Sequence, residues 1–310
     1  QEEKSIPEMA VQANYQTKVT GEYDMSLPSM KFIIDTRNGE FSDDTFILPL
    51  SATLSGYTLS VDWGDGETSD FTDGMTLNQA NMTHTYATPG EYTITLYTTQ
   101  KDRTKVQMPK LSFSRNYQNV NNNPLKLVIL VTPLLNMGTD LSDCFYNCTN
   151  LTHIPERLFE NNKEATDFSG CFSDCYRLYR FEQIPAGLFE NNKKATDFSR
   201  CFSGCGFRYI PERLFENNKE ATDFSSCFNG CYELNPIANI FCNEATEKGS
   251  RFAGKQMNFN SCFQNCGKDT DGNGTLPALW DYTIEPNSSH GYCFTGANAT
   301  NIDKVLEGWK

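Results

Sequence analysis

Two kinds of hydrophobic pattern divide the chain. In residues 31–100, apolar and polar positions alternate, and one such run places Leu59, Val61 and Trp63 on the same side of the backbone. A period of two is typical of half-buried β-strands, and Gly-Asp-Gly and Pro-Gly turn signals separate the runs. The pattern therefore predicts a small β-sandwich over residues 28–100.

Downstream of the sandwich, the pattern repeats with a longer period. The dipeptide Cys-Phe recurs six times, with steps of 27, 30, 26, 35 and 31 residues. LFENNKEATDFSGCF at 158–172 returns almost unchanged at 188–202 and 214–228. Units of this size cannot bury a core alone, so they are expected to stack on their neighbours. This predicts a solenoid of about six units with a C-terminal cap over residues 131–310.

The remaining segments have no sustained period. Residues 1–27 are polar and predict an N-terminal tether, and residues 101–130 predict a junction between the two parts. With 310 residues and 38% apolar composition, the chain is long enough for two ordinary domains.

Both parts resemble known families. VDWGDGETSD at 61–70, followed by HTYATPGEYTITLY at 84–97, resembles the polycystic-kidney-disease (PKD) repeat, an immunoglobulin-like sandwich common in bacterial exported proteins. The phrase TDFSxCFxxC, followed by Leu and then Ile-Pro, resembles the BspA-like leucine-rich repeats of bacterial surface proteins. Together they cover residues 28–310. They imply a multidomain protein with an all-β PKD-like sandwich and a right-handed leucine-rich-repeat-like solenoid of short strands with helical or 3-10 turns.

The same resemblance implies a function. It points to a non-enzymatic, secreted adhesion or recognition protein that is lipid-anchored as a lipoprotein at the outer membrane and binds a host or bacterial surface protein or glycan. The first residue, Gln1, indicates a chain whose signal peptide has already been removed. The alternative is a glycan-binding accessory protein of a polysaccharide-utilisation system.

Charge narrows the classes of partner. The formal net charge is −13 and no block of Lys or Arg occurs, which argues against nucleic acid or an anionic membrane as partner. No run reaches 18 apolar residues, so no transmembrane segment is expected in this chain. We expect a monomer without cofactors.

Eleven cysteines follow the repeat and are expected in its core. They are Cys144, Cys148, Cys171, Cys175, Cys201, Cys205, Cys227, Cys231, Cys262, Cys266 and Cys293. Ala297 fills the second cysteine position of the last unit, so this position accepts a small apolar side chain, which favours buried thiols. Disulfides, either between cysteines four apart in one unit or between stacked units, and a zinc site remain alternatives. Cys242 lies off the pattern and is expected to be the most exposed thiol.

Catalytic and metal-binding signals are weak. No nucleophile-elbow, zinc-protease, Walker or dinucleotide motif is present, and His84 is expected to have a packing or turn role rather than that of a general base. Three copies of one phrase make a poor active site, so no enzyme activity is expected. Asp269, Asp271 and Asn273 match part of a calcium loop, but the loop lacks its final glutamate, which favours a surface turn.

The candidate ligand-binding residues are those that differ between units. Leu151, Leu178 and Leu234 share one place after the second cysteine and are expected in the core. Their neighbours should therefore face outward, as an aromatic and arginine cluster that suits recognition of a protein or a sugar ring. The plainer interpretation is that the arginines cover apolar edges and pair with glutamates. The cluster consists of Tyr176, Arg177, Tyr179, Arg180 and Arg208.

Overall fold

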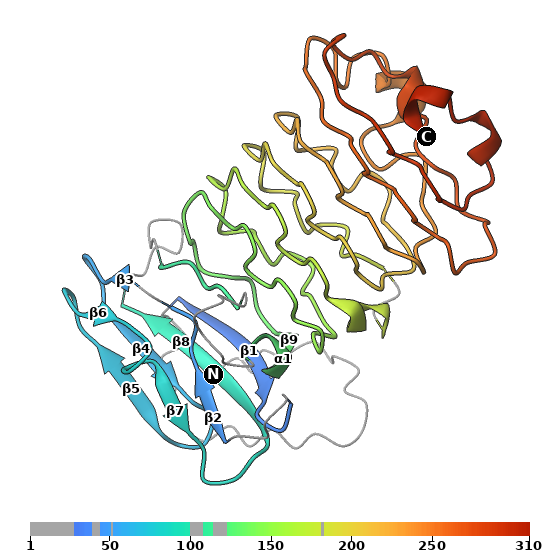
Figure 1. The fold of residues 1–310 in the computed structure, drawn as a ribbon. Coiled ribbons are helices and arrows are strands. Elements are labelled where there is room, and N and C mark those ends of the chain that lie inside the picture. Colours follow the sequence, from blue (N-terminus) through green and yellow to red (C-terminus); the bar gives the residue numbers. More distant parts are fainter. Residues whose placement is uncertain (1–27, 39–43, 51, 100–107, 114–122, 181–182) are drawn as a thin grey trace, which may run out of the picture.

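The computed structural model describes residues 28–38, 44–50, 52–99, 108–113, 123–180 and 183–310. The protein is mostly β structure with few helices (Figure 1). Strands β1 to β9 form a layered group, from which an elongated repeat region, residues 134–310, extends. No described helix is long and apolar enough to cross a membrane.

The largest sheet contains five antiparallel strands in the order β5-β4-β8-β1-β9. The buried Leu59, Val61 and Trp63 are at most 1% exposed, which confirms the predicted alternation. A shift of register by one residue would turn this apolar set to solvent. The bounds are β1 Ser29–Asp35, β4 Leu59–Asp62, β5 Thr68–Phe71, β8 Glu91–Thr98 and β9 Leu127–Leu130.

Two short strand pairs face this sheet. Phe46 in β2 is fully buried, and its ring makes an edge contact with Phe32 of β1 at 6.4 Å between centroids. This arrangement is consistent with the predicted β-sandwich. The pairs are β2 (Thr45–Ile47) with β7 (Thr83–Thr85), and β3 (Ala52–Thr53) with β6 (Thr76–Leu77).

Strand β9 joins the sandwich to the repeat region. One edge of β9 pairs with β1, and on its other edge Ile129 forms a parallel bridge with His153 of the first repeat. The segment predicted as a junction, residues 101–130, thus contributes a strand to the sheet. The apolar run that begins at Leu125 contains this strand, but its pairing could not be predicted because both partners of β9 are distant in the chain.

Successive repeats lie side by side and are joined by parallel bridges (Figure 1). In the third repeat, the Oδ1 of the bridged Asp197 also accepts the N–H of Ser199 at 2.7 Å, which fixes the local turn. Each bridge therefore links a locally ordered turn to the next repeat. The bridged residues are, in order, Asp140, Asp167, Asp197, Asp223, Asn258 and Ser289.

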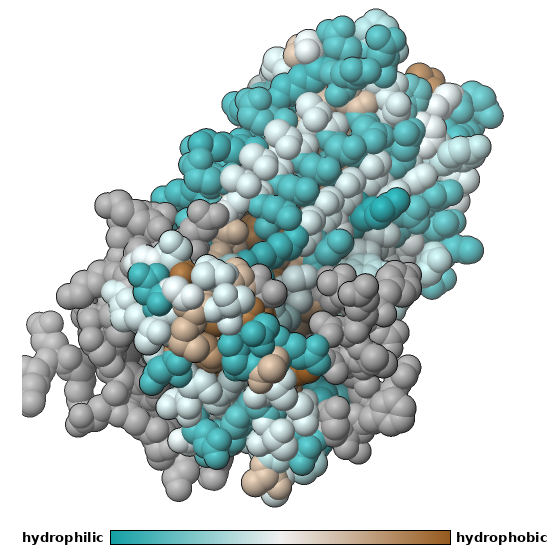
Figure 2. Space-filling view, turned by 60° about the vertical axis from the view of Figure 1, so that its left-hand side comes forward, coloured by the Kyte–Doolittle hydropathy of each residue, from teal (hydrophilic) through white to brown (hydrophobic). Residues whose placement is uncertain are grey.

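The Cys-Phe dipeptides form a second link. The N–H of Phe145 donates to the carbonyl of Cys171 at 2.9 Å, and the same bond recurs in each following repeat up to the one from Phe263 to Cys293, at 2.8 Å. Phenylalanine rings of neighbouring repeats stack with centroids 5.3 to 5.7 Å apart. The apolar residues shared by the repeats therefore form a column along the repeat region, whose outer face is mostly hydrophilic in the view of Figure 2.

Residues outside the repeat phrase close both ends of this column. At one end, the N–H of Phe113 donates to the Cys144 carbonyl at 2.8 Å. At the other, the N–H of Phe294 donates to the Trp309 carbonyl at 3.0 Å, and the two rings lie 6.1 Å apart. An array of repeats needs cover for its terminal apolar faces, and Phe113 and Trp309 provide it.

Candidate functional site

The predicted ligand-binding residues lie between the second cysteine of a repeat and the following Ile-Pro. Tyr176 and Arg177 begin the 3-10 helix η1 (Tyr176–Arg180), and Tyr176 is 53% exposed. Tyr179 and Arg180 belong to the same helix, but their side chains lie outside the described part of the structure. The core positions predicted beside them, Leu151, Leu178 and Leu234, are at most 1% exposed.

Arg208 lies on the neighbouring repeat and is paired. Its Nε is 3.4 Å from the Glu233 carboxylate, and its carbonyl accepts the N–H of Asn235 at 2.8 Å. The plainer interpretation, ion pairing with glutamate, therefore applies to Arg208. Arg177 has no ion-pair partner among the residues that the structure describes.

Two further tyrosines on this edge are exposed and were not among the predicted residues. Tyr209 and Tyr232 are 46% and 47% exposed. Tyr232 follows the second cysteine of its repeat, as Tyr176 does, and the Nζ of Lys268 lies 6.0 Å above its ring. Their signal was present in the sequence, since both stand where the repeats differ.

The residues that precede Ile-Pro, or the single Pro of the fourth repeat, form a row. Gln183 bridges Tyr209, and Tyr209 bridges Asn235, both in parallel. His153 holds the equivalent place in the first repeat, and burial lowers its pKa, so the imidazole is neutral near pH 7. Bridged neighbours lie about 4.8 Å apart. We call these four uncharged side chains the polar row: His153, Gln183, Tyr209 and Asn235.

All twelve cysteines are buried free thiols. The eleven that follow the repeat are at most 1% exposed. Burial raises the pKa of thiols such as Cys201 and Cys227 well above the ordinary value. Because metal ligation and nucleophilic attack both need the thiolate, this environment disfavours either chemistry.

The expectation that Cys242 is exposed is wrong. Its side chain is fully buried, and its Sγ lies 3.6 Å from the hydroxyl of Tyr282. Phe241, which precedes Cys242, stacks on Phe215 of the third repeat at 5.8 Å and so takes the place of the repeated Phe. Arg251 donates to the carbonyls of Phe241 at 3.1 Å and Phe215 at 3.0 Å, which ties this segment to the third repeat.

The calcium candidate forms a turn. The N–H of Asn273 donates to Asp271 Oδ1 at 3.3 Å, and the Asn273 side chain also bonds the second carboxylate oxygen. The N–H of Asp269 donates to the Tyr232 carbonyl, which ties the loop to the neighbouring repeat. Within the described ranges, no group of three or more His, Cys, Asp or Glu side chains is placed to hold a metal ion.

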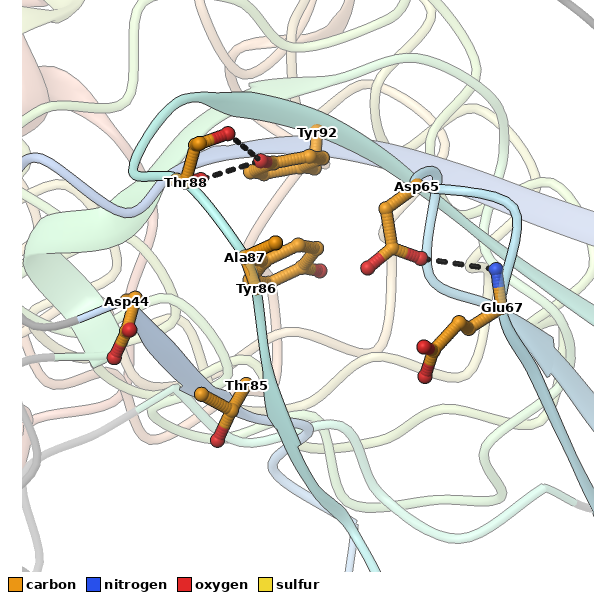
Figure 3. A pocket seen from close by; sticks show the side chains of 8 residues that line it. All are labelled: Asp44, Asp65, Glu67, Thr85, Tyr86, Ala87, Thr88 and Tyr92. Atoms are coloured by element: carbon orange, nitrogen blue, oxygen red, sulfur yellow. Dashed lines mark hydrogen bonds between the residues drawn. The ribbon is translucent and has the colours of Figure 1, made fainter.

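The sandwich carries a shallow hollow of about 570 Å³ (Figure 3). Asp65 and Glu67 border it from the β4–β5 turn, Asp44 from the segment before β2, and Tyr92 from β8. Three carboxylates with no basic residue in the lining make this hollow electronegative. The Tyr92 hydroxyl donates to the Thr88 carbonyl.

His84 is packed behind this hollow. Its ring is 8% exposed, stacks on Trp63 at 4.8 Å and meets Tyr86 edge-on at 4.6 Å. Its Nε2 lies 2.7 Å from Asp65 Oδ2, while Asp65 Oδ1 accepts the N–H of Glu67 at 3.0 Å. Both residues therefore have the packing and turn roles that their motifs predict.

The glycine of the same turn is required by a close approach. Gly64 has φ of +84°, and a Cβ there would lie 2.6 Å from the Thr93 carbonyl oxygen. Only glycine avoids both the left-handed strain and this contact. The WGDG motif is thereby explained by the backbone path of the sandwich.

Comparison with known proteins supports the sandwich. The family model described as PKD domain matches residues 45–109, and domains of this kind are typically extracellular adhesion-type or structural domains. The match starts at β2 and ends beyond β8. No family match covers the repeat region. No curated protein and no solved structure matches the chain.

Proposed function

We propose that this chain is a non-enzymatic recognition protein of the bacterial cell surface. The PKD domain acts as a stalk, and the repeat region is a BspA-like, leucine-rich-repeat-like solenoid that presents the binding surface. Export and a lipid anchor at the outer membrane belong to the same proposal, and the PKD match is consistent with an extracellular place.

One observation carries this proposal. The repeats keep their interior constant and change one exposed edge: Tyr176, Tyr209 and Tyr232 are about half exposed, whereas the column phenylalanines are at most 1% exposed. Exposed tyrosine and arginine are the residue types enriched at binding hot spots. We call the described residues of this edge the variable edge; it runs from the second cysteine to Ile-Pro in repeats one to three and to Pro236 in the fourth.

The proposed absence of catalysis rests on the same repetition. An active site needs one set of groups converging in a cleft, whereas the repeated phrase produces equivalent ridges along the axis. The thiols that recur in it are buried with raised pKa.

The test is a binding screen. The purified full chain is applied to an array that carries glycans and host matrix and mucin proteins. Reproducible binding to either class supports the proposal, and a chain that binds neither contradicts it. A Tyr179→Ala/Arg180→Ala double variant should bind at least tenfold more weakly to any hit, with unchanged melting temperature.

A further inference from the structure

The polar row gives the variable edge a definite chemistry. Its four side chains end in an imidazole, two amides and a phenol, which carry hydrogen-bond donors and acceptors without formal charge. The amide oxygen of Asn235 is buried, so Gln183 and Tyr209 present most of the accessible polar groups. Gln183 and Tyr209 are exposed, and His153 and Asn235 are partly exposed. Parallel bridges hold Gln183, Tyr209 and Asn235 in register, so their spacing along the repeat axis is fixed.

Half-exposed tyrosines belong to the same repeats as this row. Tyr176 lies on the repeat of Gln183, and Tyr232 precedes Asn235 by three positions. Tyrosine rings at half exposure offer flat apolar area at a small conformational cost. This combination fits the C–H face and the hydroxyl rim of a pyranose ring.

Charge distinguishes between neutral and acidic ligands. Of the arginines on this edge, Arg208 is paired with Glu233 at 3.4 Å, and Arg177 is exposed without an ion-pair partner among the described residues. The chain carries a formal net charge of −13, which repels polyanions at long range. An uncharged ligand is not repelled by this net charge.

We infer that the variable edge binds a neutral polysaccharide, with its chain lying along the repeat axis over the polar row and its sugar rings against Tyr209 and Tyr232. This inference rests on the proposed function and specifies its ligand. A hexose polymer fits because it repeats one hydroxyl-bearing ring, as the row repeats one polar position on each successive repeat.

Affinity gel electrophoresis tests this inference with the full chain. Native gels contain one soluble neutral polysaccharide each, from mixed-linkage β-glucan, mannan, arabinoxylan and amylopectin, or acidic alginate or hyaluronan. The test variant is Tyr209→Ala/Tyr232→Ala. The matched control is Tyr292→Ala, because Tyr292 is 65% exposed but lies on the last repeat, away from the polar row.

The expected result is retardation by at least one neutral polysaccharide. The double variant should weaken it at least tenfold, and Tyr292→Ala should leave it unchanged. Equal retardation of both variants, or retardation only by alginate or hyaluronan, overturns the inference. If the array instead shows a protein ligand that is lost in Tyr179→Ala/Arg180→Ala, the proposed function stands and the polysaccharide inference fails. Absence of all binding overturns both.

Discussion

The sandwich and the repeat region bury their cores in different ways. In the sandwich each stabilising contact occurs once: Trp63 stacks on His84, His84 pairs with Asp65, and Gly64 passes close to Thr93. In the repeat region one contact recurs, because each column phenylalanine stacks on its equivalents in the adjacent repeats. The sandwich should therefore respond to damage as one unit, and the repeats locally.

The difference also affects how surfaces can change. A substitution on the sandwich risks a contact that nothing else replaces. On the variable edge the exposed residues are separated from the column, so Tyr176 or Tyr232 can vary while Leu178 and Leu234 stay buried. A repeated interior is thus suited to carry recognition, and a single-copy interior to act as a spacer.

The largest effect should come from removing the last repeat. Deleting residues 276–310 takes away Trp309 and Phe294 and leaves the rings of Phe259 and Phe263 without cover. We expect aggregation and a lower melting temperature, measured by light scattering on a sizing column and by calorimetry. A monomeric truncated chain with unchanged melting temperature would show that no cap is needed.

A pair of core substitutions separates the two regions. Phe202→Ala and Trp63→Ala should each cost about 3–5 kcal/mol of unfolding free energy, because both rings are at most 1% exposed. Hydrogen exchange should rise throughout the sandwich in Trp63→Ala. In Phe202→Ala it should rise mainly in the neighbouring repeats, and a rise that is equally strong in the sandwich would contradict the proposed local response.

The aspartate bridges give a smaller, pH-dependent effect. Burial and the nearby Asp223 and Asp167 raise the pKa of Asp197. Because the folded state favours protonated Asp197, this residue stabilises the fold at acid pH. That stability is lost as the pH rises through the pKa, so ionised Asp197 is unfavourable at neutral pH. Asp197→Asn keeps an acceptor for Ser199 and should raise the melting temperature at pH 7 by about 1–2 °C, with no gain below the pKa.

Asp140 is the control with the opposite sign. Burial raises its pKa, but hydrogen bonds from Lys110 and Ser142 outweigh burial and leave it below the ordinary value. Ionised Asp140 therefore stabilises the fold at neutral pH, and this stability is lost as the pH falls. Asp140→Asn should lower the melting temperature at pH 7, and a rise in both variants would refute the assigned causes.

The sequence predicts the buried interior positions better than it predicts where the repeat region joins the sandwich. Alternation indicates the strands around Val61, and the repeated phrase indicates the buried column, because both periods are local. A C-terminal cap was expected, and Trp309 lies at that end of the column. Phe113 and β9 could not be predicted in their roles, since each depends on a partner far along the chain and neither carries the repeat phrase. Cys242 was misplaced for the same reason.

The candidate site was partly predictable. Comparing repeats identifies Tyr176, Arg177 and Arg208, because variation against a constant background is visible in one sequence. The same comparison could have identified Tyr209 and Tyr232, which also stand where the repeats differ and are about half exposed. The hollow beside Asp65 joins separate segments and carries no sequence signal of its own.

The smallest expected change is in the thiols. All twelve cysteines belong to the repeat region and none to the sandwich. We expect at least ten to titrate as free thiols in denaturant without prior reduction. If four or more additional thiols titrate after reduction, the core contains disulfides rather than only free thiols.

The proposal that the repeat region binds the ligand and the sandwich acts as a spacer can be tested with two variants of the full chain. Both are compared with the unmodified chain for affinity to a ligand found on the array. Tyr179→Ala/Arg180→Ala changes the variable edge, and Asp44→Ala/Glu67→Ala changes the hollow of the sandwich. The account predicts at least a tenfold loss for the first and no change for the second. A loss confined to the second variant would place recognition in the PKD domain and contradict the account.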